Sequence, residues 1–174
     1  METLIQKAKN IRLVIFDVDG ILTSGELFYG VNTTELKVFH VHDGQGIKML
    51  QKSGVIVAII TARQSTVVTK RMQDLQVTHV YQGQTDKLTA YEELKQKLHL
   101  DDKQISYVGD DLPDLPLLRR VGLSITVPDA PAIIQKQVNW ITETRAGKGV
   151  AREVSEFIMQ AQDTYQSLVE AYFR

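Results

Sequence analysis

The sequence contains no cysteine and no long hydrophobic run. Without thiols the chain cannot form disulfides, zinc–thiolate sites or a thiolate nucleophile, and its composition agrees with a reducing compartment. Its most apolar stretch, Gly54–Ala62, has nine residues, whereas a helix that spans a bilayer needs about 20. Residues 1–10 lack the basic and then apolar pattern of a signal peptide. We therefore expect a globular cytoplasmic protein with no membrane contact.

Neither sign of charge dominates the chain. It has 20 lysines and arginines against 21 acidic residues, for a formal net charge of −1, and no basic cluster. Proteins that bind nucleic acid or membrane surfaces are typically basic, so neither partner is expected. The length of 174 residues, with no repeat and no linker rich in proline, glycine or serine, predicts a single domain over 1–174.

Short apolar runs of strand length alternate with segments of helical period. This alternation, with β-branched residues in the runs, is typical of the α/β class with a doubly wound parallel sheet. Ligands of such sheets bind beyond the carboxyl ends of the strands, where the strand order reverses. The predicted strands are Leu13–Phe16, Val55–Ile60, His79–Tyr81, Ile105–Val108, Leu123–Thr126 and Val138–Trp140, and the predicted helices are Ile47–Gln51, Ser65–Leu75, Lys87–Leu98 and Leu112–Arg119.

Two segments depart from the alternation. Residues 22–42 predict a projecting β-hairpin, with strands at Glu26–Tyr29 and Glu35–His40. Over residues 148–173 apolar side chains recur at helical spacing, which predicts one long amphipathic helix of about six turns. Neither segment is large enough to form a cap domain over a site.

Polar residues follow several of the predicted strands. Asp17-Val18-Asp19-Gly20 follows the first strand, Thr61 follows the second, Lys87 opens a later helix, and three aspartates lie within residues 110–114. Taken singly, each is explained by turn and helix-cap chemistry or by a solvated lysine. Three carboxylates within five residues repel one another unless a cation lies among them. In this order, the four groups indicate one shared site.

These residue types suit phosphoryl transfer. Oxygens from Asp17, Asp110 and a main-chain carbonyl suit Mg²⁺, which keeps its other positions for water and a phosphate oxygen. The Thr61 hydroxyl and the Lys87 ammonium would bind the remaining phosphate oxygens. Because no cysteine is available, we expect Asp17 to act as the nucleophile. Asp19, about 6.6 Å farther along an extended chain, would transfer the protons.

Three other classes of protein fit some of these residues. An EF-hand calcium loop is excluded, because Gly20 comes too early and Phe28 would occupy the twelfth position. A phospho-accepting receiver module also uses aspartates, a threonine and a lysine, but its acceptor follows the third strand and lacks a second aspartate two residues later. A catalytically inactive binding subunit is disfavoured because every motif residue is present.

The ordered motifs Asp17–Gly20, Thr61, Lys87 and Gly109–Asp114 resemble those of the haloacid-dehalogenase superfamily of phosphatases. The flanking stretches, among them DVDGILTSGELFY and YVGDDLPDLPLL, are similar to a branch that acts on an eight-carbon sugar acid phosphate in lipopolysaccharide precursor synthesis. The resemblance runs from about Leu13 to Gln162. It implies hydrolysis through an aspartyl-phosphate and a homotetramer whose subunits cover one another's sites. A relative that acts on a nine-carbon sugar acid phosphate is the alternative.

The resemblance also implies individual roles. Asp19 would bind the metal through its carbonyl oxygen, and Asp111 or Asp114 would orient the metal's water ligands. Basic side chains suit a substrate that carries a carboxylate and a phosphate. Ser24 replaces a usual aspartate, which we expect to alter only the hairpin. The implied substrate-binding residues are Asp19, His40, Val41, His42, Asp43, Gly44, Lys48, Arg63, Arg71 and Lys87, with Lys148 as a further candidate for the sugar carboxylate.

Overall fold

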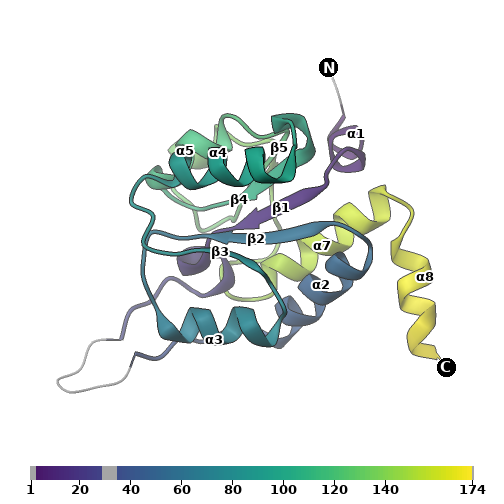
Figure 1. Cartoon of the computed structure of the whole chain (residues 1–174), viewed down its shortest axis with the longest axis horizontal. Coiled ribbons are helices and arrows are strands. Elements are labelled where there is room, and N and C mark those ends of the chain that lie inside the picture. The colour runs from purple at the N-terminus through teal and green to yellow at the C-terminus, as the bar shows by residue number, and fades with distance from the viewer. Residues whose placement is uncertain (1–2, 29–34, 174) are drawn as a thin grey trace.

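A parallel β-sheet forms the centre of the computed structural model, which describes residues 3–28 and 35–173 (Figure 1). Within these residues the sheet has six strands in the order β3-β2-β1-β4-β5-β6. Every residue of β1, β4 and β5 is buried, as expected for strands covered on both faces. The strands are β1 (Leu13–Phe16), β2 (Ile56–Ile60), β3 (His79–Tyr81), β4 (Ile105–Val108), β5 (Leu123–Thr126) and β6 (Trp140–Ile141).

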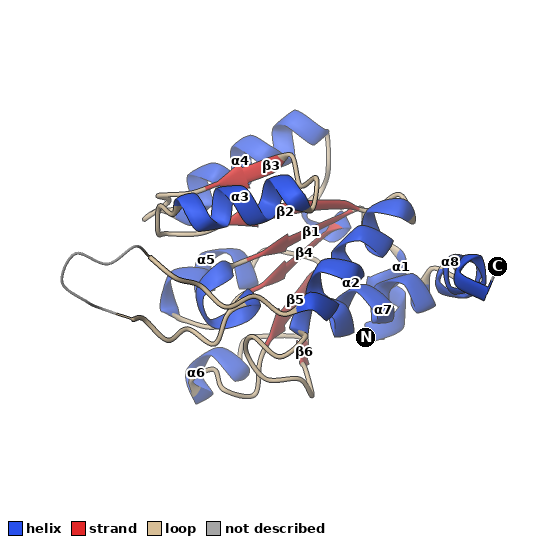
Figure 2. Cartoon of the chain, turned by 90° about the horizontal axis from the view of Figure 1, so that it is seen from below, coloured by secondary structure: helices blue, strands red, loops and turns tan. Residues whose placement is uncertain are grey.

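Helices cover both faces of this sheet (Figures 1 and 2). On one face lie α4 (Lys87–Leu98) and α5 (Leu115–Leu118), and on the other lie α2 (Val41–Lys52), α3 (Thr66–Asp74) and α7 (Val150–Ala161). The short helix α1 (Leu4–Lys9) packs against α7, and α6 (Ala132–Gln135) precedes β6. The doubly wound α/β fold predicted from the sequence is confirmed, and no described helix is long and apolar enough to cross a bilayer.

The strand order places a switch point between β1 and β4. β1 pairs with β2 on one side and with β4 on the other, and all pairings are parallel. The chain leaves β1 toward one face of the sheet and β4 toward the other, which opens a crevice beyond their carboxyl ends. Asp17 directly follows β1, and Asp110 lies two residues beyond the end of β4. The fold therefore brings the two predicted metal-binding carboxylates to one crevice.

Helix α2 begins earlier than its sequence pattern suggests. The prediction of Ile47–Gln51 was too short, because the helix starts at Val41 with His40 as its N-cap. Two glycines obscure the first turns, since glycine has a low helix propensity. Gly46 is required by packing: a Cβ atom there would lie 2.7 Å from Cα of Arg152 in α7.

The two described arms of the predicted hairpin, residues 24–28 and 35–40, project from the sheet and are here called the projecting segment, but they are not strands (Figure 1). Residues 24–28 and 35–40 carry no ladder hydrogen bonds, and the predicted turn at 30–34 lies outside the described residues. Leu27, Phe28, Leu36 and Val38 on these arms are exposed. A two-stranded hairpin without a surface to pack on is marginally stable, which explains why the strand pattern is not realised here.

The long C-terminal helix is interrupted. Helix α7 ends at Ala161, and the chain continues as α8 (Tyr165–Glu170) and a final 3₁₀ turn (Ala171–Phe173). Asp163 takes a positive φ of 58°, which no continuous helix accommodates, and Thr164 then donates its N–H back to the Met159 carbonyl. The apolar spacing over 148–173 thus belongs to two helices with different directions (Figure 1).

Candidate active site

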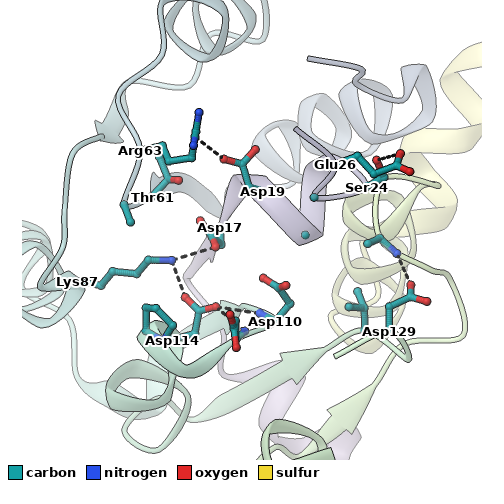
Figure 3. A pocket seen from close by; sticks show the side chains of 17 residues that line it. Asp17, Asp19, Ser24, Glu26, Thr61, Arg63, Lys87, Asp110, Asp114 and Asp129 are labelled. Atoms are coloured by element: carbon teal, nitrogen blue, oxygen red, sulfur yellow. Dashed lines mark hydrogen bonds and ion pairs between the residues drawn. The ribbon is translucent and has the colours of Figure 1, made fainter. Parts of the chain in front are cut away.

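Lys87 lies between two aspartates at the carboxyl edge of the sheet (Figure 3). As the first residue of α4, it extends its ammonium to Oδ2 of Asp17 at 2.9 Å and to Oδ1 of Asp114 at 2.6 Å. The side chains of Lys87 and Asp114 are 2% and 1% exposed, so these are buried ion pairs. Tyr107 on β4 donates its hydroxyl to the same Asp114 oxygen at 2.5 Å. The group is therefore fixed before any ligand arrives.

Asp114 acts as an organiser of the loop that follows β4. Its Oδ2 accepts the main-chain N–H groups of Asp110 at 2.9 Å and of Asp111 at 3.1 Å. With Lys87 and Tyr107 on its other oxygen, the Asp114 carboxylate has four close polar partners. Gly109 permits this close packing, since a Cβ atom there would lie 2.5 Å from Cγ of Asp114. Asp114 thus holds the main chain that carries Asp110, and its expected role in orienting metal-bound water stays a prediction.

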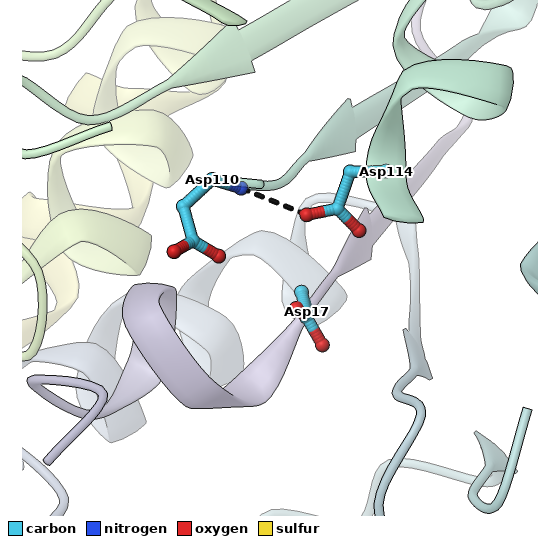
Figure 4. A group of neighbouring side chains, drawn as sticks. All are labelled: Asp17, Asp110 and Asp114. Carbon is cyan, nitrogen blue, oxygen red and sulfur yellow. Dashed lines mark hydrogen bonds between the residues drawn. The ribbon is translucent and has the colours of Figure 1, made fainter. Parts of the chain in front are cut away.

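The acidic cluster has the properties of a divalent-cation site (Figure 4). Asp17, Asp110 and Asp114 each offer an oxygen within 4.8 Å of the others. Oδ1 of Asp17 is buried and has no hydrogen-bond partner among the described residues. Gly20, at φ +92°, lets the chain pass the Asp110 carboxylate, which a Cβ atom would meet at 2.1 Å. A cation held by Asp17 and Asp110 would satisfy the unpartnered oxygen and the excess negative charge.

The raised pKa values of Asp17 and Asp110 also favour a bound cation. Burial, together with the charge of Asp114, raises the pKa of Asp17 to about 6, although Lys87 opposes the shift. Burial, followed by the charges of Asp114 and Asp17, raises the pKa of Asp110 to about 7. Raised pKa values mean that the ionised forms are less stable here than in free carboxyl groups, and a bound cation offsets this loss of stability. The predicted Mg²⁺ ligands Asp17 and Asp110 fit this role, and the Asp19 carbonyl stays a prediction.

Asp19 lies across the crevice from Asp110, two residues after Asp17 as the sequence predicts (Figure 3). Its carboxylate contacts the Lys37 ammonium through Oδ1, and Nε of Arg63 lies 3.5 Å from Oδ2. Thr61, at the end of β2, is buried and lines the same cavity. The structure thus assembles Asp17, Asp19, Thr61, Arg63, Lys87 and Asp110 around one space.

That space is a cavity of about 480 Å³, within the size range of small-ligand sites. Its inner wall carries the residues predicted to bind metal and phosphate, and its outer wall comes from residues 24–26 and from the loops that follow β5 and β6. Ser24 donates its hydroxyl to Glu26 at 2.9 Å, and Oδ2 of Asp129 accepts the N–H of Ala146 at 3.0 Å. The expectation that Ser24 alters only the hairpin was too narrow, because Ser24 lines this cavity.

Several predicted substrate residues do not line the cavity of their own chain. The Asp43 carboxylate accepts the N–H of Arg152 at 3.0 Å and thereby caps α7. Arg71 donates to the His40 carbonyl at 3.4 Å and lies over the Phe39 ring. His42 and Lys148 line a neighbouring cavity of about 450 Å³ beside α7. The members of this set are His40, Val41, His42, Asp43, Gly44, Lys48, Arg71 and Lys148, and their contacts with substrate stay predictions.

Sequence reasoning missed several residues of the site. Asp129 follows the end of β5 by three residues, so the rule of polar groups after strands could have found it. Glu26, Glu35 and Lys37 gave no such signal, because they lie on the projecting segment, which has no fixed spacing to the strands. Tyr107 lies within the buried strand β4, and its position in an apolar run gave no sign that its hydroxyl contacts Asp114.

The arrangement defines a hydrolase that uses clustered aspartates at the carboxyl ends of parallel strands. In agreement, a family model described as haloacid dehalogenase-like hydrolase matches residues 76–154, which include Lys87 and Asp110. The Yersinia pestis protein named 3-deoxy-D-manno-octulosonate 8-phosphate phosphatase KdsC is 44% identical over 162 residues, covering 93% of this chain and 87% of that protein.

Solved structures agree with the sequence comparison. A probable YrbI family phosphatase from Pseudomonas syringae is 43% identical, with a TM-score of 0.96 and coverage of 98% of this chain and 97% of that one. The Moraxella catarrhalis 3-deoxy-D-manno-octulosonate 8-phosphate phosphatase, solved with magnesium, phosphate and KDO, is 42% identical, with a TM-score of 0.94 and 97% of both chains covered. The chain therefore belongs to the haloacid dehalogenase-like hydrolases, in the family of the KdsC phosphatases. The family expected from the motifs is confirmed, and the receiver alternative is excluded.

Proposed function

We propose that the protein hydrolyses 3-deoxy-D-manno-octulosonate 8-phosphate to 3-deoxy-D-manno-octulosonate and phosphate. The observation that carries this proposal is the Asp17 carboxylate, which lies at the cavity with one oxygen on Lys87 and the other buried without a hydrogen-bond partner. Similarity to the named phosphatases from Yersinia pestis and Moraxella catarrhalis supports the choice of substrate.

The reaction begins with attack of an Asp17 oxygen on phosphorus, which breaks the bond to the sugar oxygen. Lys87 and Thr61 line the inner wall, where an ammonium and a hydroxyl neutralise and bind phosphate oxygens. Asp19 gives a proton to the departing sugar alkoxide. Asp19 then takes a proton from the water that attacks the aspartyl-phosphate, which releases phosphate and regenerates Asp17.

Mg²⁺ is the proposed cofactor, held by the carboxylates of Asp17 and Asp110 and by the Asp19 carbonyl. When bound, it supplies positive charge to the phosphoryl group and to the acidic cluster. Asp114 keeps Asp110 in place through the main chain of its loop, and Asp111 lies beside it at the cavity.

The sugar would lie against the outer wall of the cavity. Glu26, Ser24 and Asp129 offer hydrogen-bond acceptors that suit the hydroxyl groups of a polyol. Arg63 is the basic side chain at the open part of the cavity, 44% exposed, and is suited to an anionic group of the substrate.

A direct assay tests the proposal. Purified protein with Mg²⁺ should release inorganic phosphate from 3-deoxy-D-manno-octulosonate 8-phosphate, with a higher kcat/KM than for other phosphorylated sugars. A panel should include a nine-carbon sugar acid phosphate and a neutral hexose phosphate of the same phosphate position. A higher kcat/KM for the nine-carbon compound would select the alternative substrate instead.

We further propose a cytoplasmic homotetramer in which the projecting segment lies between subunits. Leu27, Phe28, Leu36 and Val38 form an exposed apolar patch on the described arms, a feature typical of interaction sites. Light scattering should give a mass close to four times 19.6 kDa, and Leu36→Glu with Val38→Glu should lower it; a fully active monomer would contradict this assembly.

A further inference from the structure

A chain of alternating charges connects the projecting segment to Asp19. The Lys37 ammonium contacts Oδ1 of Asp19 and lies 3.6 Å from Oε1 of Glu35. Through its other oxygen, Oε2, Glu35 accepts a hydrogen bond from the Ser65 hydroxyl at 2.7 Å. Nη2 of Arg63 lies 3.8 Å from Oε1 of Glu35. Residues 35–37 are thus fastened to the loop that follows β2 and to the turn that follows β1.

Lys37 reaches Asp19 from outside the substrate cavity. Asp19 and Arg63 line the cavity of about 480 Å³, whereas Lys37 lines a separate cavity of about 130 Å³ between the two arms and Gly147. The Lys37 side chain is only 5% exposed, against 44% for Arg63. An ammonium in this position is covered by the arm and does not face the space that a substrate fills. Any influence on the reaction must therefore pass through Asp19.

Asp19 has few other fixed contacts. The Thr23 hydroxyl lies 3.4 Å from Oδ1, and the exposed Arg63 lies 3.5 Å from Oδ2. Both distances are long for a hydrogen bond. Asp19 also lies in a turn that reverses at Gly20, so no regular helix or strand restrains its side chain. Lys37 makes the close contact that fixes where this carboxylate points.

We propose that Lys37 is a positioning residue, which holds the Asp19 carboxylate at the sugar-oxygen side of the site, and that Glu35 anchors Lys37. This inference rests on the proposed phosphoryl transfer with Asp19 as proton donor. A proton donor must lie within hydrogen-bond reach of the leaving oxygen, so a rotated Asp19 side chain slows the first step. Substrate binding by Lys87, Thr61 and Arg63 is left intact.

The test compares two leaving groups in single-turnover release of the alcohol. When an alkyl phosphate is cleaved, the leaving oxygen must be protonated. When p-nitrophenyl phosphate is cleaved, the p-nitrophenolate anion is stable enough to depart without a proton. For Lys37→Met we expect alcohol release from the alkyl phosphate to fall about tenfold to a hundredfold, part of the usual general-acid contribution. Release of p-nitrophenol should fall less than about threefold, and KM should change little for both. Lys37→Arg should recover most of the rate.

Matched variants separate positioning from damage to the fold. Lys52→Met removes the same charge from an exposed position at the end of α2 and should leave both rates unchanged. Glu35→Gln should reproduce the Lys37→Met pattern more weakly. In an Asp19→Asn background, Lys37→Met should cause no further loss, because the group through which Lys37 acts is absent. Each variant should stay folded at the assay temperature and keep the wild-type mass in solution, and loss of the nearly buried Lys37 ammonium should lower the thermal midpoint.

Other outcomes overturn the inference. Equal losses for both leaving groups, a further loss in the Asp19→Asn background, or wild-type rates in Lys37→Met would each remove the positioning role. Failure of the proposed substrate is separable: a wild type that hydrolyses the alkyl and aryl phosphates but not 3-deoxy-D-manno-octulosonate 8-phosphate refutes the substrate and leaves the leaving-group comparison valid.

Discussion

The two walls of the cavity are built in different ways (Figure 3). On the inner wall, Asp17, Lys87 and Asp114 stand at the ends of buried strands or at the start of a helix, and their ion pairs are at most 2.9 Å long. On the outer wall, Glu26 and Asp129 come from loops, and the Asp129–Arg145 pair is 3.6 Å long with Arg145 75% exposed. The proposed phosphate end is therefore preorganised by the fold of one chain, whereas the proposed sugar end is open and adaptable. Loss of an inner-wall group should abolish the chemistry, and loss of an outer-wall group should weaken recognition.

The largest expected effect is that of Asp17→Asn. The amide cannot attack phosphorus, so hydrolysis should fall at least about 10⁴-fold. The fold should survive, because the substitution removes a buried charge that Asp114 and Asp110 repel. Phosphate release and thermal midpoint measure the two effects, and substantial activity in this variant would remove Asp17 from the role of nucleophile.

Lys87→Met tests the inner wall as a structural unit. The substitution leaves Asp17 and Asp114 buried without their shared cation, which should cost about 3–5 kcal/mol of unfolding free energy and most of the activity. Lys95→Met is the control: Lys95 also contacts two acidic groups, Glu92 and Asp102, but at the surface, where the cost should stay below about 1 kcal/mol. Urea unfolding measures both, and equal costs would contradict the contrast between buried and exposed pairs.

The acidic cluster should make the stability of the metal-free protein depend on pH. Because the folded state raises the pKa of Asp17 from 3.8 to about 6 and that of Asp110 to about 7, it holds more protons than the unfolded chain between about pH 4 and 7. Stability in a chelator should therefore fall by up to a few kcal/mol as pH rises through this window. Mg²⁺ binds the ionised carboxylates, so its stabilising effect should grow over the same range. Scanning calorimetry with chelator and with Mg²⁺ at pH 5 and pH 8 checks this; Asp110→Asn should flatten the chelator curve.

The inner wall was predictable from the sequence because strands impose order. Asp17, Thr61 and Asp110 follow apolar runs of fixed length, and the parallel sheet brings the ends of those runs to one edge. Lys87 was also predictable, because the helical pattern of Lys87–Leu98 begins at this residue and the helix starts at the same edge of the sheet (Figure 3). Within the described residues, four of the six strands have the predicted bounds, and β2 begins one residue later than predicted.

The outer wall was not predictable, because its residues depend on contacts between distant loops. Gly147 donates its N–H to the Ile21 carbonyl, and a Cβ atom on Gly147 would lie 2.5 Å from the Ser24 nitrogen. Only this packing brings Ser24 and Glu26 beside Ala146 and Asp129. In the same way, the kink at Asp163 depends on one residue with positive φ in an otherwise helical pattern. The periodicity of apolar residues predicts helices and strands, but it does not predict which loops contact one another.

The smallest expected effect tests the outer wall. Glu26→Gln keeps the size of the side chain and the contact with Ser24 but removes the negative charge that would accept hydrogen bonds from sugar hydroxyls in the proposed complex. We expect KM for the sugar acid phosphate to rise about threefold to tenfold with kcat nearly unchanged, since one charged hydrogen bond contributes about 1.5–3 kcal/mol at most when fully buried and less in an open site. Inhibition by inorganic phosphate, which in the proposed mechanism would contact only the inner wall, should stay the same. If phosphate inhibition weakens in parallel with substrate binding, the two walls are one unit and the separation between a preorganised phosphate end and an adaptable sugar end fails.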